Sequence, residues 1–249
     1  MRPHPYSLSV IVPVFNEREN LPELLNRLNA TFSALDAEHI EVIIVDDSSR
    51  DNSFDVIKSL SSEHAEINGI RLQKNVGSQQ ALLCGLAHIR GNVVISMDAD
   101  LQHPPEYIPE MLEAWSKGAD IVEMARDRAP KNGIFNTLCA KLFYSLLNSL
   151  ETTPAPSEYC DFRLLDSYCV NQITNLSSRT GFLRQAVYNL SRTRHELTFS
   201  IAPRYSGKSR YTLTRLISIG LEAIALKAPP HCDVVEVVKI PIPTIESRA

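Results

Sequence analysis

The stretch VVISMDAD, residues 93–100, decides the fold. Its first part, residues 93–97, is apolar and rich in β-branched side chains, which predicts a strand buried on both faces, as in a parallel sheet. Asp98 and Asp100 follow at once. Because residues i and i+2 of an extended chain project to the same side, both carboxylates would aim at one point. A divalent cation between or beside them would relieve their mutual repulsion.

Strand and helix signals alternate through the first half of the chain. Strand-like runs lie at residues 8–14, 40–45, 69–72 and 93–97. Apolar residues at helical spacing follow the first three runs, and the third of these helices is expected at residues 79–89. Short connections between such elements indicate a mostly parallel sheet with right-handed crossovers. We therefore expect one α/β domain in which helices flank a central sheet.

Each predicted strand ends in a polar sequence. These sequences are PVFNE (13–17), DDSS (46–49), NVGSQ (75–79) and DADLQ (98–102). Ligands of open α/β sheets bind at the carboxyl ends of the strands, so one crevice would collect all four sequences. An isolated D-x-D triplet is usually a solvated turn or a helix cap, but its position at this edge favours a metal site. Carboxylate oxygens without Cys or clustered His suit Mg²⁺ or Mn²⁺.

Composition argues against several classes of protein. The net charge of −4 and the pI of about 6.0 give no general attraction to nucleic acid. The 5 cysteines are odd in number and form no C-x-x-C pair, which predicts reduced thiols in a cytoplasmic protein. The N-terminus lacks the apolar core of a signal peptide, and no stretch approaches the roughly 20 apolar residues of a membrane span. Peripheral contact with the cytoplasmic membrane face stays open.

Several motifs resemble those of family 2 glycosyltransferases, and they occur in the same order. They are VIVPVFNE (10–17), VDDSS (45–49), NVG (75–77) with Ala81 and Gly85, DADLQHPPE (98–106) and DFRL (161–164). The most similar branch is that of the dolichyl-phosphate mannose synthases and polyprenyl-phosphate glycosyltransferases. The resemblance covers residues 7–212. It implies a GT-A (Rossmann-like) fold, a nucleotide-diphosphate sugar donor, a Mg²⁺ or Mn²⁺ cofactor and inversion at the anomeric carbon.

The resemblance also assigns residues to the donor and to the metal. Those on the nucleotide side are Pro13, Val14, Asn16, Glu17, Asp46, Asn75, Gly77, Asp98 and Ala99. Those that would reach the metal and the diphosphate are Asp98, Asp100 and Gln102. Asp47 is expected only to cap its turn, and a turn beside a helix N-terminus is an equally good interpretation of Gly77. His103, with the two prolines after it, is expected to set the chain direction rather than to touch substrate, because consecutive prolines are expected to keep the backbone extended and to exclude helix.

The nature of the acceptor decides what Asp161 would do. A saccharide hydroxyl must lose a proton, and Asp161 in CDFRLLD is the candidate base. The resemblance implies that this aspartate lies in the active site. Its alternative role is structural: pairing with Arg163 or capping the helix that starts near Asp166.

A lipid phosphate acceptor is already anionic and needs cations rather than a base. The loop after the predicted strand at residues 121–125 supplies Arg126, Arg128 and Lys131. The segment RYSGKSRY resembles the family motif R-x-x-G-x-S-K-Y, with Arg in place of its Lys, and supplies Arg204, Lys208, Ser209 and Arg210. Either cluster could instead be a solvated face.

The end of the chain departs from the pattern of this branch. We expect a GT-A domain at residues 1–212 and a C-terminal helix and strand extension at residues 213–249, with a strand at 234–240 and no transmembrane helix. Many members of the branch continue into membrane helices here, so the departure puts the lipid acceptor in doubt. The apolar stripe between residues 135 and 150 favours packing on a core, with contact to a lipid surface as the alternative.

Taken together, these patterns predict an inverting, metal-dependent glycosyltransferase. Its donor would be a UDP- or GDP-sugar and its acceptor a polyprenyl (undecaprenyl or dolichyl) phosphate, with a saccharide hydroxyl as the alternative. A nucleotidyltransferase fits less well, because no Gly-rich phosphate loop follows the first strand. An inactive nucleotide-binding domain also fits less well, because the acidic residues are intact. The sequence leaves the sugar and the oligomeric state open.

Overall fold

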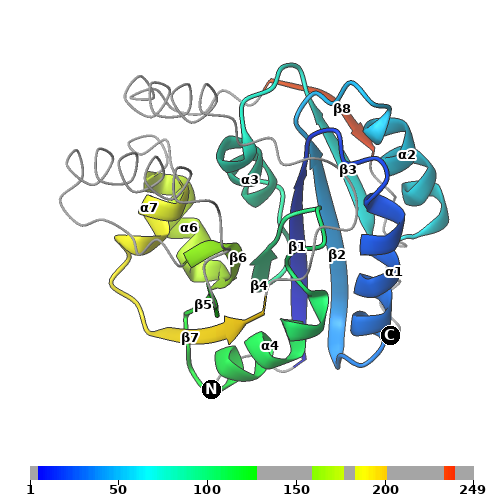
Figure 1. Cartoon of the computed structure of the whole chain (residues 1–249). Coiled ribbons are helices and arrows are strands. Elements are labelled where there is room, and N and C mark those ends of the chain that lie inside the picture. Colours follow the sequence, from blue (N-terminus) through cyan, green and yellow to red (C-terminus); the bar gives the residue numbers. More distant parts are fainter. Residues whose placement is uncertain (1–4, 128–158, 177–182, 201–232, 239–249) are drawn as a thin grey trace, which may run out of the picture.

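The computed structural model describes residues 5–127, 159–176, 183–200 and 233–238. In these ranges the chain forms three layers, with helices on both faces of one central sheet (Figure 1). This is the single-domain α/β architecture that the sequence predicts.

The described part of the sheet holds 8 strands in the order β7-β5-β6-β4-β1-β2-β3-β8. They are β1 (Tyr6–Val14), β2 (Ala37–Asp46), β3 (Ile67–Leu72), β4 (Val93–Ser96), β5 (Ile121–Arg126), β6 (Tyr159–Asp166), β7 (Arg194–Phe199) and β8 (Val234–Val238). The block β4-β1-β2-β3 is parallel, and β7 is parallel to β5. β6 runs antiparallel to β4 and β5, and β8 antiparallel to β3. The strand order reverses between β1 and β4, which is where sheets of this kind open a ligand crevice.

Two groups of helices cover the two faces of the sheet. α1 (Leu21–Phe32), α2 (Ser53–Glu63) and α4 (Ile108–Ser116), which follows the 3₁₀ helix η1 (Pro105–Tyr107), pack into one apolar core. α3 (Ser78–Leu86), α6 (Ser167–Leu176) and α7 (Leu183–Tyr188) pack into a second core. Neighbouring strand residues such as Val10 and Ile11 belong to opposite cores, because side chains alternate across a strand.

Local sequence explains where α1 and α3 lie. α1 carries Pro22 in its first turn, where a missing N–H costs no hydrogen bond. Its buried leucines, including Leu21, Leu24 and Leu28, form the stripe expected at helical spacing. In α3, Gly85 permits close approach to the sheet, because a Cβ at this position would overlap Cγ2 of Ile11.

The strands and helices expected from the first half of the sequence are present, with small differences at their ends. α3 ends at Leu86 rather than at residue 89. β4 ends at Ser96, although Met97 still donates a main-chain hydrogen bond to Ile11 (3.1 Å). The expected strand at 121–125 is β5, and the expected strand at 234–240 is described as β8 up to Val238. The sequence pattern does not predict β6 and β7.

Two further expectations concern membranes. Across the described ranges, every helix falls short of the length and apolarity that a membrane span requires. The apolar stripe between residues 135 and 150 lies outside the described residues.

Candidate active site

The carboxyl ends of four parallel strands meet at one edge of the sheet. At each end the chain turns through a residue with positive φ, namely Asn16 (52°), Ser48 (61°), Gly77 (87°) and Leu101 (64°). Residues other than glycine rarely adopt this conformation, and such strained positions collect at functional sites. The four polar sequences that follow the strands therefore share this edge.

Asp98 and Asp100 follow β4 at this edge, as their spacing predicts. Asp98 keeps 37% of its side chain exposed, whereas Asp100 is 9% exposed and accepts a hydrogen bond from the main chain of Gln102 (3.1 Å). Burial and the charges of Asp161 and Asp100, in that order, raise the pKa of Asp98 to about 8. Because the side chain of Asp98 keeps contact with solvent, repulsion from the two neighbouring carboxylates contributes strongly to this rise. Asp98 is thus an acid that repulsion keeps from ionising easily.

Asp161 faces Asp98 from β6. The antiparallel register pairs Ser96 with Arg163, and continuing it by two residues sets Asp98 opposite Asp161. The hydroxyl of Ser96 donates to the main-chain oxygen of Asp161 (2.7 Å). Burial alone would raise the pKa of Asp161, but the charges of Arg184 and Arg163 and a hydrogen bond outweigh it and lower this pKa. Asp161 is therefore the ionised member of the opposed pair.

Two side chains hold the Asp161 carboxylate from the α3 and α7 side. Gln79 donates to Oδ2 of Asp161 (2.6 Å), and Nη2 of Arg184 lies 3.4 Å from the same oxygen. On the other oxygen, Arg163 lies 3.5 Å away, which is the pairing that the sequence suggests as the structural role of Asp161. No local motif in the sequence marks Gln79 as a partner of Asp161, and none marks Arg184 at all.

His103 contacts the turn that carries Asp98 and Asp100. Its Nδ1 accepts a hydrogen bond from the main-chain N–H of Asp98 (2.9 Å), and its ring stacks on Phe162 at 5.2 Å between centroids. Burial lowers the pKa of His103 to about 4, so the ring is neutral at physiological pH. His103 thus shapes the chain, as expected. After it, Pro104 is extended as predicted, but Pro105 opens η1, because a proline is tolerated at the first position of a helix.

The residues after β4 fit a hard divalent cation, although they do not enclose one by themselves. Within the described ranges no three His, Cys, Asp or Glu side chains are arranged as a metal site. The fit comes from the carboxylates of Asp98 and Asp100, whose repulsion a cation would relieve. An ion such as Mg²⁺ uses one or two carboxylates and takes its other ligands from water and substrate phosphates.

Asp47 holds the loop that follows β3. Its carboxylate accepts hydrogen bonds from the main-chain N–H groups of Val76 (2.7 Å) and Gly77 (2.9 Å), and Asn75 donates to its main-chain oxygen (3.2 Å). The sequence suggests only that Asp47 caps its own turn, so this link between two loops is new. Gly77 also precedes α3 directly with φ of 87°, which agrees with the turn interpretation.

The expected nucleoside residues divide into buried and accessible ones. Pro13, Val14 and Asp46 have buried side chains, and Asp46 lies 3.5 Å from Arg71. Asn16 and Glu17 are partly exposed. They line a cavity of about 340 Å³ together with Arg18, Glu19, Asn20, Asp51 and Asn52. The side chains of the first three are therefore not accessible to a nucleoside in this structure.

The expected acceptor-binding cations are only partly described. Arg126 ends β5, and its charge lowers the pKa of Asp98, so it lies within electrostatic reach of the acidic residues. The other residues expected to bind the acceptor, which include the hydroxyl of Ser209, lie outside the described residues. They are Arg128, Lys131, Arg204, Lys208, Ser209 and Arg210.

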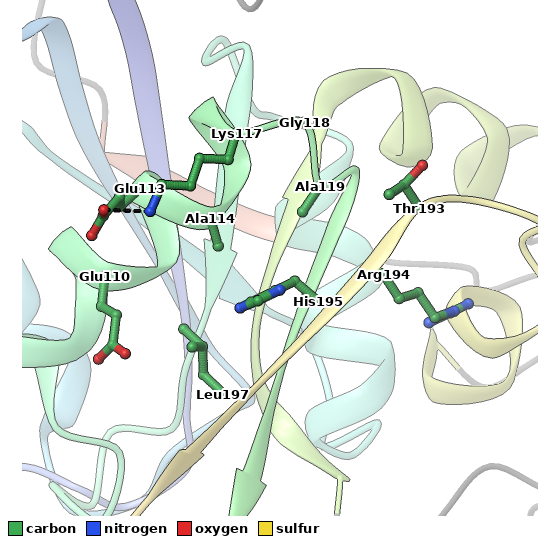
Figure 2. Close-up of a pocket in the computed structure, with 10 residues that line it drawn as sticks. All are labelled: Glu110, Glu113, Ala114, Lys117, Gly118, Ala119, Thr193, Arg194, His195 and Leu197. Atoms are coloured by element: carbon green, nitrogen blue, oxygen red, sulfur yellow. Dashed lines mark hydrogen bonds and ion pairs between the residues drawn. The ribbon is translucent and has the colours of Figure 1, made fainter.

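A second cavity, of about 300 Å³, lies between α4 and β7 (Figure 2). Its lining includes Lys117, Ala119 and His195, which stand near the amino ends of β5 and β7. These strands run parallel to β4, so this cavity is at the end of the sheet opposite Asp98. We therefore place the candidate active site at the edge of the sheet that carries Asp98 and Asp100, which we call the acidic edge, rather than in this cavity.

Comparison with known proteins agrees with the sequence motifs. The chain matches the model of glycosyl transferase family 2 over residues 9–173. It is 31% identical over 217 residues to an uncharacterized glycosyltransferase of Synechocystis sp., covering 87% of this chain and 68% of that protein. It is 34% identical over 222 residues to the undecaprenyl-phosphate 4-deoxy-4-formamido-L-arabinose transferase of Pseudomonas fluorescens, covering 88% and 64%. The chain thus spans about two thirds of the length of these relatives.

Solved structures agree on the fold. Glucosyl-3-phosphoglycerate synthase from Mycobacterium tuberculosis, in complex with Mn²⁺, UDP and phosphoglyceric acid, superposes with a TM-score of 0.58 and 17% identity, covering 88% of this chain and 76% of that one. The GT-A architecture that the motifs imply is therefore present. The family match includes the polar ends of β1 to β4 as well as Asp161. The chain belongs to glycosyl transferase family 2.

Proposed function

We propose that this glycosyltransferase moves a sugar, with inversion at the anomeric carbon, from a UDP- or GDP-sugar to a polyprenyl phosphate, with Mg²⁺ or Mn²⁺ as cofactor. One observation carries the proposal. Asp98 and Asp100 stand at the carboxyl end of β4, opposite Asp161 of β6, at the edge where four polar loops meet. A negatively charged edge of this kind suits a cation together with a diphosphate.

The donor would lie along the ends of β1 to β4. Asn16 and Glu17 line the cavity beside β1, and the loop with Asn75 and Gly77 is tied to Asp47. Asp98, Asp100 and Gln102 would hold the cation, with Ala99 between the two acids. When bound, the cation supplies positive charge that stabilises the departing nucleoside diphosphate.

The partners of the Asp161 carboxylate, rather than its charge, favour an anionic acceptor. Its carboxylate already accepts a hydrogen bond from Gln79 and faces the cations Arg184 and Arg163. A phosphate oxygen brings no proton that must be removed, so the acceptor would not need this carboxylate as a base. The curated relative from Pseudomonas fluorescens is named for undecaprenyl phosphate. Its name supports the acceptor class proposed here.

The proposed acceptor would be bound by cationic side chains close to the membrane surface. Arg126 would meet the acceptor phosphate together with the basic residues Arg128, Lys131, Arg204, Lys208 and Arg210 and with the hydroxyl of Ser209. A polyprenyl chain stays in the bilayer, so the edge with Asp98 would have to reach the membrane surface from the cytoplasm. We propose residues 1–212 as the catalytic domain, with residues 213–249 as an extension that contributes β8.

A saccharide hydroxyl is the second candidate acceptor. It is favoured by the ionised state of Asp161, since an ionised carboxylate close to Asp98 could take a proton from a hydroxyl. The two candidates differ in their need for this base. Asp161→Asn should abolish transfer to a hydroxyl and spare part of the transfer to a lipid phosphate.

Thermal unfolding tests the donor and the metal, because a ligand that binds the native state raises stability. UDP or GDP with Mn²⁺ should raise the midpoint, and EDTA or Asp100→Ala should remove the rise. Stabilisation by a nucleoside triphosphate without metal would contradict the proposal. Transfer of radiolabelled sugar to undecaprenyl phosphate in detergent, compared with a panel of saccharides, tests the acceptor. Transfer to saccharides alone would overturn the lipid assignment.

A further inference from the structure

A row of alternating charges leads from Asp161 through the interior to β7. Arg163 lies 3.5 Å from Asp161 on one side, and its Nε lies 3.7 Å from Glu123 on the other. Glu123 continues to Arg194, with 3.1 Å between Oε1 and Nη1. The side chains of Arg163 and Glu123 are only 1% and 3% exposed. The row thus connects the acidic edge to a residue far from it in the sequence.

Arg194 ends this row at the carboxyl terminus of α7. Its Nη2 donates to the main-chain oxygens of Val187 (2.5 Å), Tyr188 (3.0 Å) and Leu190 (3.1 Å). The last carbonyl groups of a helix have no partner within it, and a cation at this end also interacts favourably with the helix dipole. Arg194 is therefore the cap that fixes the end of α7.

The amino-terminal end of α7 contacts Asp161. Arg184 lies 3.4 Å from the Asp161 carboxylate, and its main-chain N–H donates to Gln79 (3.3 Å). Gln79 in turn donates to Asp161 (2.6 Å). The two routes from Asp161, one through the buried charges and one through α7, therefore meet at Arg194.

Figure 2 shows that the side chains of Arg194 and His195 leave β7 on opposite sides, with His195 pointing toward α4, although both residues belong to the lining of the cavity. Neighbouring strand residues alternate in this way. His195 is exposed. It is therefore a natural control for changes that affect β7 but not the charge row.

We infer that Arg194 is a positioning residue of this enzyme, which holds α7, and with it Arg184, against Asp161. The inference rests on the proposed role of Asp161 in the active site. Removing Arg194 would leave Glu123, among the residues that the structure describes, with Arg163 as its cationic neighbour at 3.7 Å and would free the end of α7. A buried charge that loses its partner is costly, so Glu123 and Arg163 would shift or take up water. Arg184 and Asp161 would lose their fixed geometry as a result.

Arg194→Met tests the inference through local motion and through kinetics. Hydrogen exchange, followed by mass spectrometry, should become about tenfold faster in residues 183–188 and stay unchanged in β1 and β2. The kcat of transfer should fall by about a hundredfold, because small misplacements of catalytic groups have effects of that size. KM for the donor should not change, since the donor loops lie on the other strands. Arg194→Lys keeps one charge and should lose less activity, and His195→Ala should behave as the wild type.

A double-mutant cycle separates positioning from a general loss of stability. If Arg194 acts through Arg184, then Arg184→Met should cost little further activity once Arg194→Met is present. If the fold losses in kcat of the two single variants multiply in the double variant, the inference is wrong. Unchanged hydrogen exchange in residues 183–188 would also overturn it. If the wild type transfers no sugar to any acceptor, the proposed function fails, and the exchange experiment alone decides whether Arg194 holds α7.

Discussion

The hydroxyl of Ser96 donates to the main-chain oxygen of Asp161 across 2.7 Å, and this bond joins the end of β4 to the start of β6. Both residues are buried, at 3% and 9% exposure. The bond fixes the register that sets Asp98 opposite Asp161. One antiparallel strand thus adds a third carboxylate to a crevice that is otherwise built from parallel strands.

Ser96→Ala should lower the free energy of unfolding by about 1–3 kcal/mol, because the carbonyl of Asp161 would stay buried without its partner. Urea unfolding followed by circular dichroism measures the change. The matched control is Ser116→Ala, which removes an exposed hydroxyl bonded within α4. This control should stay within about 0.5 kcal/mol of the wild type. An equal loss in both variants would count against a special role for the Ser96 bond.

The pH dependence of stability should reveal the repulsion at Asp98. Its pKa rises from 3.8 to about 8 on folding, so the metal-free folded state binds a proton more tightly than the unfolded chain. This contribution is fully present below pH 3.8 and is lost as the pH rises to about 8. Asp98→Asn should therefore be more stable than the wild type at pH 8, with a gap that closes toward pH 4. Thermal unfolding in EDTA measures the gap.

Mn²⁺ with UDP or GDP provides the control for this experiment. The pair should stabilise the wild type at pH 8 and should have little effect on Asp98→Asn. A gap between the two proteins that is constant from pH 4 to pH 8 would show that Asp98 titrates normally.

Asp47→Ala should loosen the loop of Val76 and Gly77, since both main-chain N–H groups lose a charged acceptor. Each hydrogen bond to a charged group contributes about 1.5–3 kcal/mol to stability, and in the variant water would bind the two N–H groups and recover part of that energy. We expect donor affinity to fall about tenfold in isothermal titration calorimetry, which corresponds to about 1.4 kcal/mol. Asp55→Ala removes an exposed carboxylate of α2 and should leave affinity unchanged. Unchanged affinity in Asp47→Ala would separate this loop from donor binding.

Gly85→Ala should destabilise the protein by about 1–3 kcal/mol, because the new methyl group would be overpacked between α3 and the sheet. It would overlap Cγ2 of Ile11 and lie 3.3 Å from Cγ2 of Val45. Gly77→Ala is the comparison, since a Cβ there would meet no atom within 4 Å but the backbone has φ of +87°. Unfolding in guanidinium should show a lower free energy of unfolding for both variants. The rate of hydrogen exchange in the interior of α3 should rise only in Gly85→Ala.

The parallel half of the fold could be predicted because β1, β2 and β4 each contain a continuous apolar run. β1, β2 and β4 are buried on both faces, so burial alone specifies them, and short connections specify their direction. β6 is different, because Arg163 and Asp161 interrupt its apolar pattern and both are buried as ion pairs. A pattern that treats charged residues as exposed cannot identify such a strand.

The same distinction applies to the candidate site. Asp98 and Asp100 could be identified from the sequence because they are two residues apart and directly follow an apolar strand, which is a local pattern. The contacts of Gln79 and Arg184 with Asp161 could not, because each joins segments that are distant in the chain and no local pattern records the pairing. The resemblance to known glycosyltransferases indicated Asp161 and the sequence suggested its pairing with Arg163, whereas only the structure shows its contacts with Gln79 and Arg184.

β8 lies at one border of the described sheet, where it pairs with β3 although residues 73–233 separate the two strands in the sequence. During translation β3 leaves the ribosome long before Val234–Val238 are made. Until then, its outer main-chain N–H and C=O groups have no β8 to bind, and an uncovered strand edge of this kind is prone to join other chains. Shortened versions that stop before residue 233 should therefore aggregate more readily in cells, whatever their catalytic residues can do.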